Sequence, residues 1–194
     1  MIGEKEMLFL GLIVILLIFN NVSLLISYRK GAKHVKLMDI LKSKDYVLYI
    51  LLLEYFLLPL NAIIAVVQES YITILLIVGF ISMFFGITIN FVARKELSRY
   101  WTPFSEQPQN SHLVKTGIYS RVRHPIYLSG FIYFFGLVLV AGNLYGVILF
   151  LIFISALAIR IVMEEKQLNH KFGIEYRIYS KETPVIVPRV FTRR

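Results

Sequence analysis

The sequence predicts an all-α integral membrane protein. Of its 194 residues, 57% are hydrophobic and only 17% are charged, whereas a soluble domain has about 25% charged residues. The apolar residues are concentrated in five stretches, and a helix needs about 20 apolar residues to cross the hydrocarbon core of a bilayer. Because these stretches take up most of the chain, we expect a single membrane domain, 1–194, without a separate soluble catalytic domain.

We expect five membrane-spanning helices. The apolar stretch of the first is too long for a signal peptide, it is preceded by Glu4 and Glu6, and it lacks a small-residue cleavage site. The fourth has only 16 residues and is followed at once by Gly142 and Asn143, a break typical of a helix end. We therefore expect the fourth and fifth helices to form an antiparallel hairpin. The predicted spans are 7–27, 46–67, 71–93, 126–141 and 144–163.

The basic residues predict how the chain lies in the membrane. Of the 21 Lys and Arg residues, 19 fall in the first loop, in segment 94–125 or in segment 164–194. Positively charged loops stay in the cytoplasm, so we expect the N-terminus outside and the C-terminus in the cytoplasm. The membrane is then a plasma membrane in a prokaryote or the endoplasmic reticulum in a eukaryote. The net charge of +9 is explained by this topology and by membrane lipids, without nucleic acid.

Polar groups gather at the cytoplasmic ends of the predicted hairpin. Arg123 and His124 precede Pro125, which is favourable in the first turn of a helix, and the start of a helix attracts anions. At the other end, Arg160 and Glu164 are one turn apart on a helix, and Glu165 follows. Two other interpretations remain open: an interfacial belt of tyrosine and arginine, and a helix-terminal salt bridge. The hairpin would bring both groups to one cytoplasmic cavity.

This mixture of charges and aromatic rings suits S-adenosylmethionine, which carries a carboxylate, an ammonium, an adenine and a sulfonium. A sulfonium is attracted to the faces of tyrosine rings. The sequence predicts no metal site, because cysteine is absent and the four histidines lack metal-binding spacing. A Rossmann-type methyltransferase is excluded, because no glycine-rich turn joins a strand to a helix.

The region around these residues resembles the isoprenylcysteine carboxyl methyltransferase and phospholipid methyltransferase family. The resemblance covers residues 111–188, and the short chain suggests a prokaryotic member. It consists of an Arg-His-Pro-x-Tyr motif with a preceding Gly-x-Tyr, paired glutamates after the hairpin, and Phe-Gly-x-x-Tyr-x-x-Tyr followed by proline. The matching residues are Gly117, Tyr119, Arg123, His124, Pro125, Tyr127, Glu164, Glu165, Phe172, Gly173, Tyr176, Tyr179 and Pro184.

The resemblance implies S-adenosylmethionine as methyl donor, with S-adenosylhomocysteine as product. It assigns catalytic roles to Arg160, which would orient an acceptor carboxylate, and to Glu164. The choice between Glu164 and Glu165 as the cofactor contact stays open. The residues expected at the cofactor are Ser111, His112, Leu113, Val114, Gly117, Tyr119, Arg123, His124, Pro125, Tyr127, Glu164 and Glu165.

The expected acceptor is a lipophilic small molecule or prenylated peptide that enters from the bilayer. Carboxyl O-methylation of a prenylcysteine-like C-terminus is favoured, because a carboxylate is already ionised at pH 7 and needs no base. N-methylation of an aminophospholipid is the alternative within enzymes, and it requires a glutamate or histidine to accept a proton. The alternative of another class is a non-catalytic membrane scaffold that binds anionic lipid.

Overall fold

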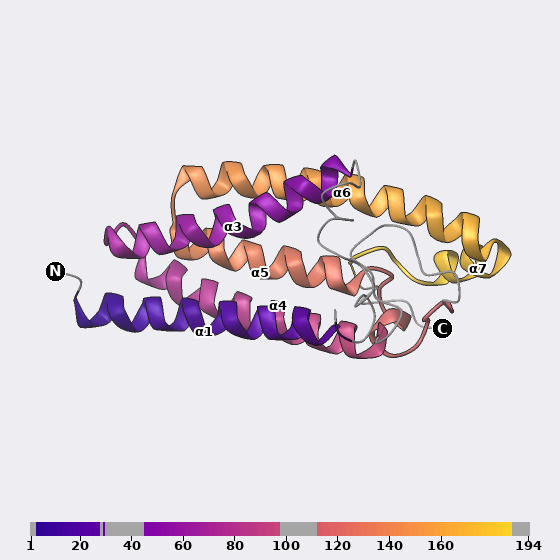
Figure 1. The fold of residues 1–194 in the computed structure, drawn as a ribbon, viewed down its shortest axis with the longest axis horizontal. Coiled ribbons are helices and arrows are strands. Elements are labelled where there is room, and N and C mark those ends of the chain that lie inside the picture. The colour runs from indigo at the N-terminus through magenta and orange to yellow at the C-terminus, as the bar shows by residue number, and fades with distance from the viewer. Residues whose placement is uncertain (1–2, 28, 30–44, 98–111, 188–194) are drawn as a thin grey trace.

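The computed structural model describes residues 3–27, 29, 45–97 and 112–187, and every regular element within these ranges is a helix. The long helices lie side by side in an elongated bundle (Figure 1). The all-α prediction is therefore confirmed for this part of the chain. The elements are α1 (Glu4–Ser27), α3 (Tyr46–Val67), α4 (Thr73–Leu97), the 3₁₀ helix η3 (Gly117–Ser120), α5 (Pro125–Ala141), α6 (Leu144–Phe172) and α7 (Ile174–Glu182).

Four helices in the described ranges, α1, α3, α4 and α6, are long and apolar enough to cross a membrane. The apolar helix α5 has only 17 residues, which is shorter than these candidates. The five predicted spans thus reduce to four candidates, and a crossing by α5 stays a prediction, as does the orientation in the membrane. Helix α3 coincides with the predicted span 46–67.

Helix α6 continues nine residues beyond the predicted span end at Met163. Residues 164–172 are polar but include glutamate, lysine, glutamine and leucine, which are good helix formers. The helix ends at Gly173, whose φ of 53° is accessible to glycine at little cost. Hydropathy therefore located the end of the apolar stretch, whereas the helix itself reaches into the polar segment and carries Glu164 and Glu165 with it.

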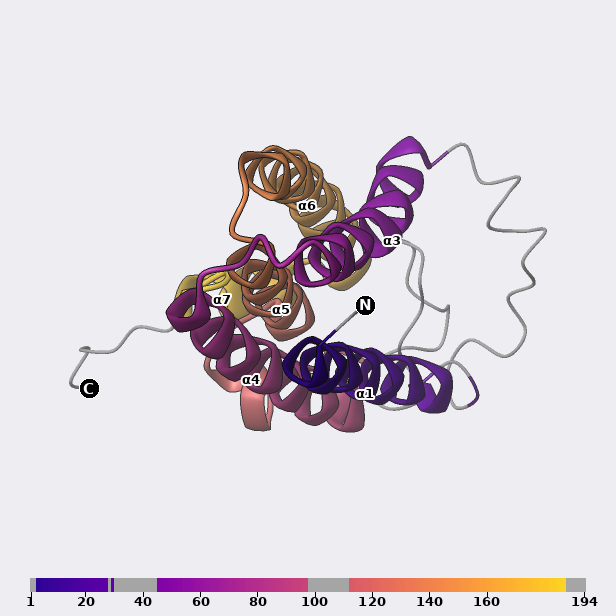
Figure 2. The same cartoon turned by 90° about the vertical axis from the view of Figure 1, so that its left-hand side faces the viewer.

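Helix α5 lies among α3, α4 and α6, as the view along the bundle shows (Figure 2). Its backbone is closest to α4, because Gly79 and Gly136 face each other. A Cβ atom added to either glycine would lie 2.6 Å from the carbonyl oxygen of the other. The Ser82 hydroxyl donates to the Ile132 carbonyl at 2.7 Å. Small side chains at the contact let the two backbones approach closely, as in many membrane helix pairs.

The connection between α5 and α6 is fixed by polar contacts. Gly142 ends α5 in the left-handed conformation, at φ 60°, and its N–H donates to Val138. The Asn143 side chain then caps α6 by accepting from the Gly146 N–H at 2.8 Å. It also exchanges amide hydrogen bonds of 3.2 Å with Asn61 of α3. This end of the bundle therefore joins α3, α5 and α6.

Helix α1 packs at the edge of the bundle (Figures 1 and 2). Most of its large apolar side chains are exposed. An apolar helix surface of this kind is suited to contact with lipid. Glu6 accepts a hydrogen bond from the Tyr71 hydroxyl at 2.8 Å. Further along, Asn20 donates to the Tyr55 hydroxyl at 3.1 Å. These contacts hold α1 against α3 and the start of α4.

We predict that Gly136→Ala destabilises the bundle by about 1–3 kcal/mol, because the added methyl overpacks the α4–α5 contact. The matched control is Gly130→Ala in the same helix, where the nearest atom, in the Phe153 ring, would lie 3.7 Å away. Thermal unfolding in detergent measures both. Equal midpoints for the two variants would contradict the close packing.

Candidate functional site

The site begins at the turn that leads into α5. His124 occupies the N-cap position and Pro125 the first turn of the helix. The backbone N–H of Arg123 donates to the Pro184 carbonyl at 2.9 Å, and that of His124 donates to Val185 at 3.0 Å. The segment after α7 therefore runs along this turn and fixes it, although about 60 residues separate the two in sequence.

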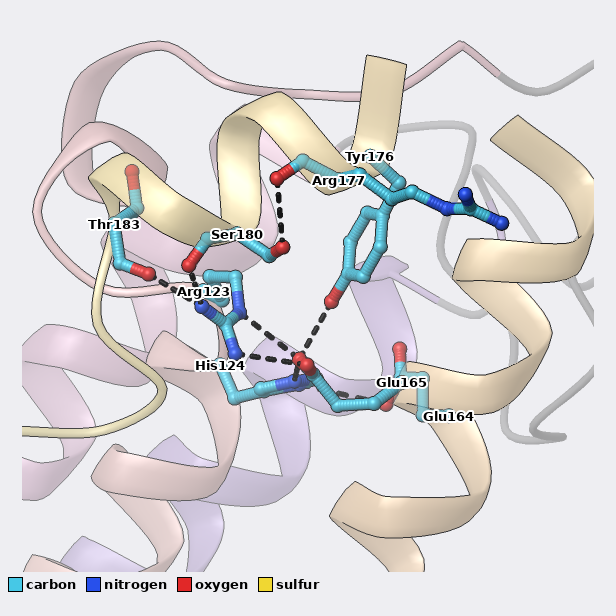
Figure 3. A network of polar contacts seen from close by, with 8 residues as sticks. All are labelled: Arg123, His124, Glu164, Glu165, Tyr176, Arg177, Ser180 and Thr183. Atoms are coloured by element: carbon cyan, nitrogen blue, oxygen red, sulfur yellow. Dashed lines mark hydrogen bonds and ion pairs between the residues drawn. The ribbon is translucent and has the colours of Figure 1, made fainter. Parts of the chain in front are cut away.

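Glu165 of α6 is the centre of a polar network at this turn (Figure 3). Its carboxylate accepts from Arg123 through Nε at 3.0 Å and Nη2 at 2.8 Å. His124 Nε2 lies 2.7 Å from the same carboxylate, and the Tyr176 hydroxyl also donates to it. The Glu165 carboxylate therefore links helix α6 to the turn before α5 and to helix α7.

Arg123 extends the network to the end of α7. Its Nη1 donates to the backbone carbonyl of Ser180 at 2.7 Å and to that of Thr183. Only 9% of its side chain is exposed. A guanidinium in such a position needs several partners, because a buried charge without them is costly. Arg123 thus serves as a clamp between α6 and the C-terminal segment.

The network is charged at neutral pH. Burial alone would raise the pKa of Glu165, but hydrogen bonds from His124, Arg123 and Tyr176 outweigh it and lower this pKa to about 2. Glu165 lies in the polar part of α6, beyond the apolar stretch. Burial and the hydrogen bond to Glu165 raise the pKa of Tyr176, which keeps its hydroxyl protonated as a donor.

A cavity of about 720 Å³ lies beside this network. Small-molecule sites typically have about 300–1,000 Å³. The structure brings most of the predicted site residues to its wall, whereas Gly117 and Glu165 are not among the lining residues, and Ser111 lies outside the described residues. The predicted residues on the wall are His112, Leu113, Val114, Tyr119, Arg123, His124, Pro125, Tyr127, Arg160 and Glu164.

The two adjacent glutamates have different surroundings. Glu164 lines the cavity, and its carboxylate lies 3.7 Å from His124 Nδ1, whereas Glu165 contacts the other ring nitrogen. His124 is 4% exposed and is held between the two carboxylates. Its ring stacks on Tyr127, with centroids 5.4 Å apart. The cavity thus has a polar end with an imidazole, a carboxylate and tyrosine rings.

Two buried tyrosines, Tyr119 and Tyr179, pack at the polar end of the cavity. The Tyr179 hydroxyl donates to the backbone carbonyl of Tyr119 at 2.6 Å. Burial, followed by the charge of Glu164, raises the pKa of Tyr119, and burial raises that of Tyr179 to about 12. Both rings therefore stay neutral at physiological pH and present aromatic faces and hydroxyl groups.

Gly117 does not line the cavity, and its contacts are within the loop that precedes α5 and with α4. It has a φ of 56°, and a Cβ there would lie 1.9 Å from a carboxylate oxygen of Glu96. That carboxylate accepts the Ile118 N–H at 3.1 Å. Sequence reasoning missed Glu96, because nothing in its pattern marks a contact with a residue 21 positions further along the chain.

Arg160 forms an ion pair with Asp45 at the start of α3. Sequence reasoning considered Glu164 as its partner, since the two are one turn apart, and it missed Asp45. The usable signal was the position of Asp45 directly before an apolar stretch, which is typical of an N-cap. Its carboxylate indeed caps α3 by accepting the Leu48 N–H at 2.9 Å.

The rest of the cavity wall combines polar groups of α4 with apolar side chains. Arg94 donates to Asn90 at 2.6 Å, and Asn90 donates to Ser129 of α5 at 3.0 Å. All three line the cavity. Beyond them the wall is built by leucines and phenylalanines of the long apolar helices, including Leu24, Leu25, Leu51, Leu52, Phe134 and Phe153. The cavity is thus amphipathic, because charged, polar and apolar side chains all line it.

Fold and site define a helical membrane protein with a cavity whose wall is partly charged and partly apolar. The model of the phospholipid methyltransferase family matches residues 74–175, more than half of the chain, and the chain belongs to this family. The protein-S-isoprenylcysteine O-methyltransferase of Schizosaccharomyces pombe is similar, with 36% identity over 87 residues. That match covers 44% of this chain and 37% of the relative, so this chain spans little more than a third of the relative's length.

We predict that Glu165→Gln lowers the free energy of unfolding by about 3 kcal/mol, because it leaves the buried Arg123 without its charged partner. Glu164→Gln is the matched control, since it changes the neighbouring carboxylate on the cavity wall. Unfolding in detergent, followed by circular dichroism, compares the two. Equal losses would show that Glu165 is no more structural than Glu164.

Proposed function

We propose that the protein is an S-adenosylmethionine-dependent methyltransferase for a lipophilic acceptor embedded in the membrane. The observation that carries this proposal is the amphipathic cavity, whose wall combines His124 and Glu164 with apolar side chains of the long helices. Membership in the phospholipid methyltransferase family supports it. Neither a metal ion nor a nucleic acid has a part in the proposal.

The polar end fits the methyl donor by its chemistry. His124 and the start of α5 suit the donor carboxylate, and Glu164 suits its ammonium or ribose. The rings of Tyr119 and Tyr127 suit adenine or the sulfonium. When bound, S-adenosylmethionine supplies an electrophilic methyl group. We assign Glu165 to a positioning role, because it holds His124 and Arg123 without lining the cavity.

The favoured acceptor is a carboxylate on a prenylcysteine-like C-terminus. The name of the S. pombe relative supports this choice, and so does Arg160, a cation on the cavity wall that suits a carboxylate. In the reaction a carboxylate oxygen forms a bond to the methyl carbon, and the carbon–sulfur bond breaks with its electron pair left on sulfur. No proton moves, so the residues need only align the reactants and exclude water.

N-methylation of an aminophospholipid is the second candidate, because the matching family model describes phospholipid methyltransferases. An amine must lose a proton, and Glu164 and His124 lie 3.7 Å apart at the cavity as acceptors for it. A scaffold that binds anionic lipid is the candidate of another class, and it requires no affinity for S-adenosylmethionine.

In the proposed topology the N-terminus is outside and the cavity opens to the cytosol. Segments 94–125 and 164–194, of which residues 98–111 and 188–194 lie outside the described ranges, would then form the active site at the membrane surface, where the donor enters. The acceptor tail would enter from the bilayer between α1 and α3, whose residues Leu24, Leu25, Leu51 and Leu52 line the cavity.

A transfer assay in lipid nanodiscs tests the reaction. With S-adenosylmethionine, we expect a farnesylated cysteine to gain one methyl group as an ester, identified by mass spectrometry and by its cleavage in base. Arg160→Lys keeps the charge but loses the fork of donors, so kcat/KM for this acceptor falls roughly 10- to 100-fold. Methylation of phosphatidylethanolamine instead would favour the amine alternative, and no transfer to either acceptor would contradict the proposal.

A further inference from the structure

The ion pair between Asp45 and Arg160 links two helices at the wall of the cavity. Arg160 lines the cavity and is 2% exposed. The Asp45 side chain is 14% exposed and is not among the lining residues. Tyr127 of α5 also hydrogen-bonds to Arg160, and it interacts in turn with Glu164. The Arg160 side chain therefore pairs with Asp45 on the side of α3 and borders the cavity on another side.

A guanidinium this deeply buried needs a counter-charge at every stage of a reaction cycle, because an unpaired buried charge is strongly unfavourable. Asp45 supplies that counter-charge in this structure. An acceptor carboxylate that reaches Arg160 from the cavity brings a second negative charge to the same cation. The methyl ester formed from it is neutral and brings none. The need for Asp45 thus differs between substrate and product.

Asp45 is placed so that it can release Arg160 without becoming unpaired. Its Oδ2 atom contacts Arg160, whereas Oδ1 accepts the Leu48 N–H at the start of α3. That helix has 22 residues, and a helix N-terminus stabilises a negative charge. The Asp45 side chain is also more exposed to water than that of Arg160. Both features reduce the free-energy cost of exchanging one carboxylate for another at Arg160.

We propose that Asp45 is the resident counter-ion of Arg160 and competes with the acceptor carboxylate for it. The ion pair opens when a carboxylate acceptor binds and closes again when the ester has formed, which favours release of the product. Asp45 is then a specificity-determining residue that sets the relative affinity for acid and ester. This inference rests on the proposed carboxyl methylation.

Asp45→Asn tests the competition, because asparagine caps a helix as well as aspartate does but carries no charge. The measured quantities are the dissociation constants of a farnesylated cysteine acid and of its methyl ester, with S-adenosylhomocysteine present. We expect the variant to bind the acid about tenfold more tightly than wild type does, since the competing charge is gone, with little change for the ester. Asp45→Glu, which keeps the charge, should retain the wild-type ratio.

A purely structural role for Asp45 would weaken acid and ester by the same factor, and that result would overturn the inference. An Asp45→Asn variant with the wild-type ratio of acid to ester dissociation constants would overturn it too. Should the asparagine variant fail to fold, Asp45→Ser offers another helix cap without the charge.

Infrared difference spectra of the wild-type protein give a second measurement without any variant. The chain has only two aspartates, Asp39 and Asp45, so ¹³C-labelled aspartate gives few bands. Binding of the acid should shift an aspartate carboxylate band, and binding of the ester should not. Identical spectra for the two ligands would overturn the inference.

These binding measurements need no turnover, so they separate the two proposals. A tenfold gain in acid affinity without any methyl transfer would refute the methyltransferase proposal and keep Asp45 as counter-ion. Methyl transfer to the acid together with an unchanged ratio of acid to ester affinity would support the methyltransferase proposal and refute the role of Asp45 as a competitor. If neither acid nor ester binds, while an amine acceptor is methylated, the role of Asp45 as a competitor is overturned.

Discussion

The hydrogen bonds of the Glu165 carboxylate are the constraint on which the site depends. Through them, one side chain of α6 holds Arg123 and His124 before α5 and Tyr176 of α7. These segments are far apart in sequence, and backbone hydrogen bonds from Arg123 and His124 to Pro184 and Val185 add to the same junction. Because His124 is held by Glu165 on one side, its ring faces Glu164 and the cavity on the other.

Packing in the apolar part of the bundle positions the helices that carry this network. Glycines at the contact let α5 lie close against α4, and the Asn61–Asn143 pair holds α3 to the start of α6. Helix α1 lies at the edge of the bundle (Figure 2), and its residues Asn20, Asn21, Leu24 and Leu25 line the cavity. The structure thus combines a closely packed centre with an edge whose apolar side chains are exposed.

The sequence predicted those features that depend on local pattern. Hydropathy located α3 at its observed bounds, and the Gly142–Asn143 break marked the end of α5 and the start of α6. The Arg-His-Pro motif and the paired glutamates indicated which residues to bring together. What the sequence left open was how two neighbours divide their roles. Glu164 and Glu165 differ by about 100° around a helix, and the packing of α6 against α3, α5 and α7 decides which one faces the cavity.

Long-range partners were beyond the reach of sequence reasoning. Asp45 and Arg160 are 115 positions apart, and Glu96 meets the loop at Gly117 only because α4 and η3 are packed together. The length of α6 was also underestimated, because the hydropathy signal ends where the membrane would end. In each case the missing information is tertiary packing, which a single sequence does not display.

The central claim is that the network at Glu165 shapes a cavity that binds the methyl donor. Titration calorimetry of S-adenosylhomocysteine into the purified protein tests it most directly. The account predicts saturable binding with one site per chain, weakened about tenfold or more in Glu164→Gln because a charge-assisted contact is lost. Absence of binding by the folded wild-type protein, or unchanged affinity in that variant, would contradict it.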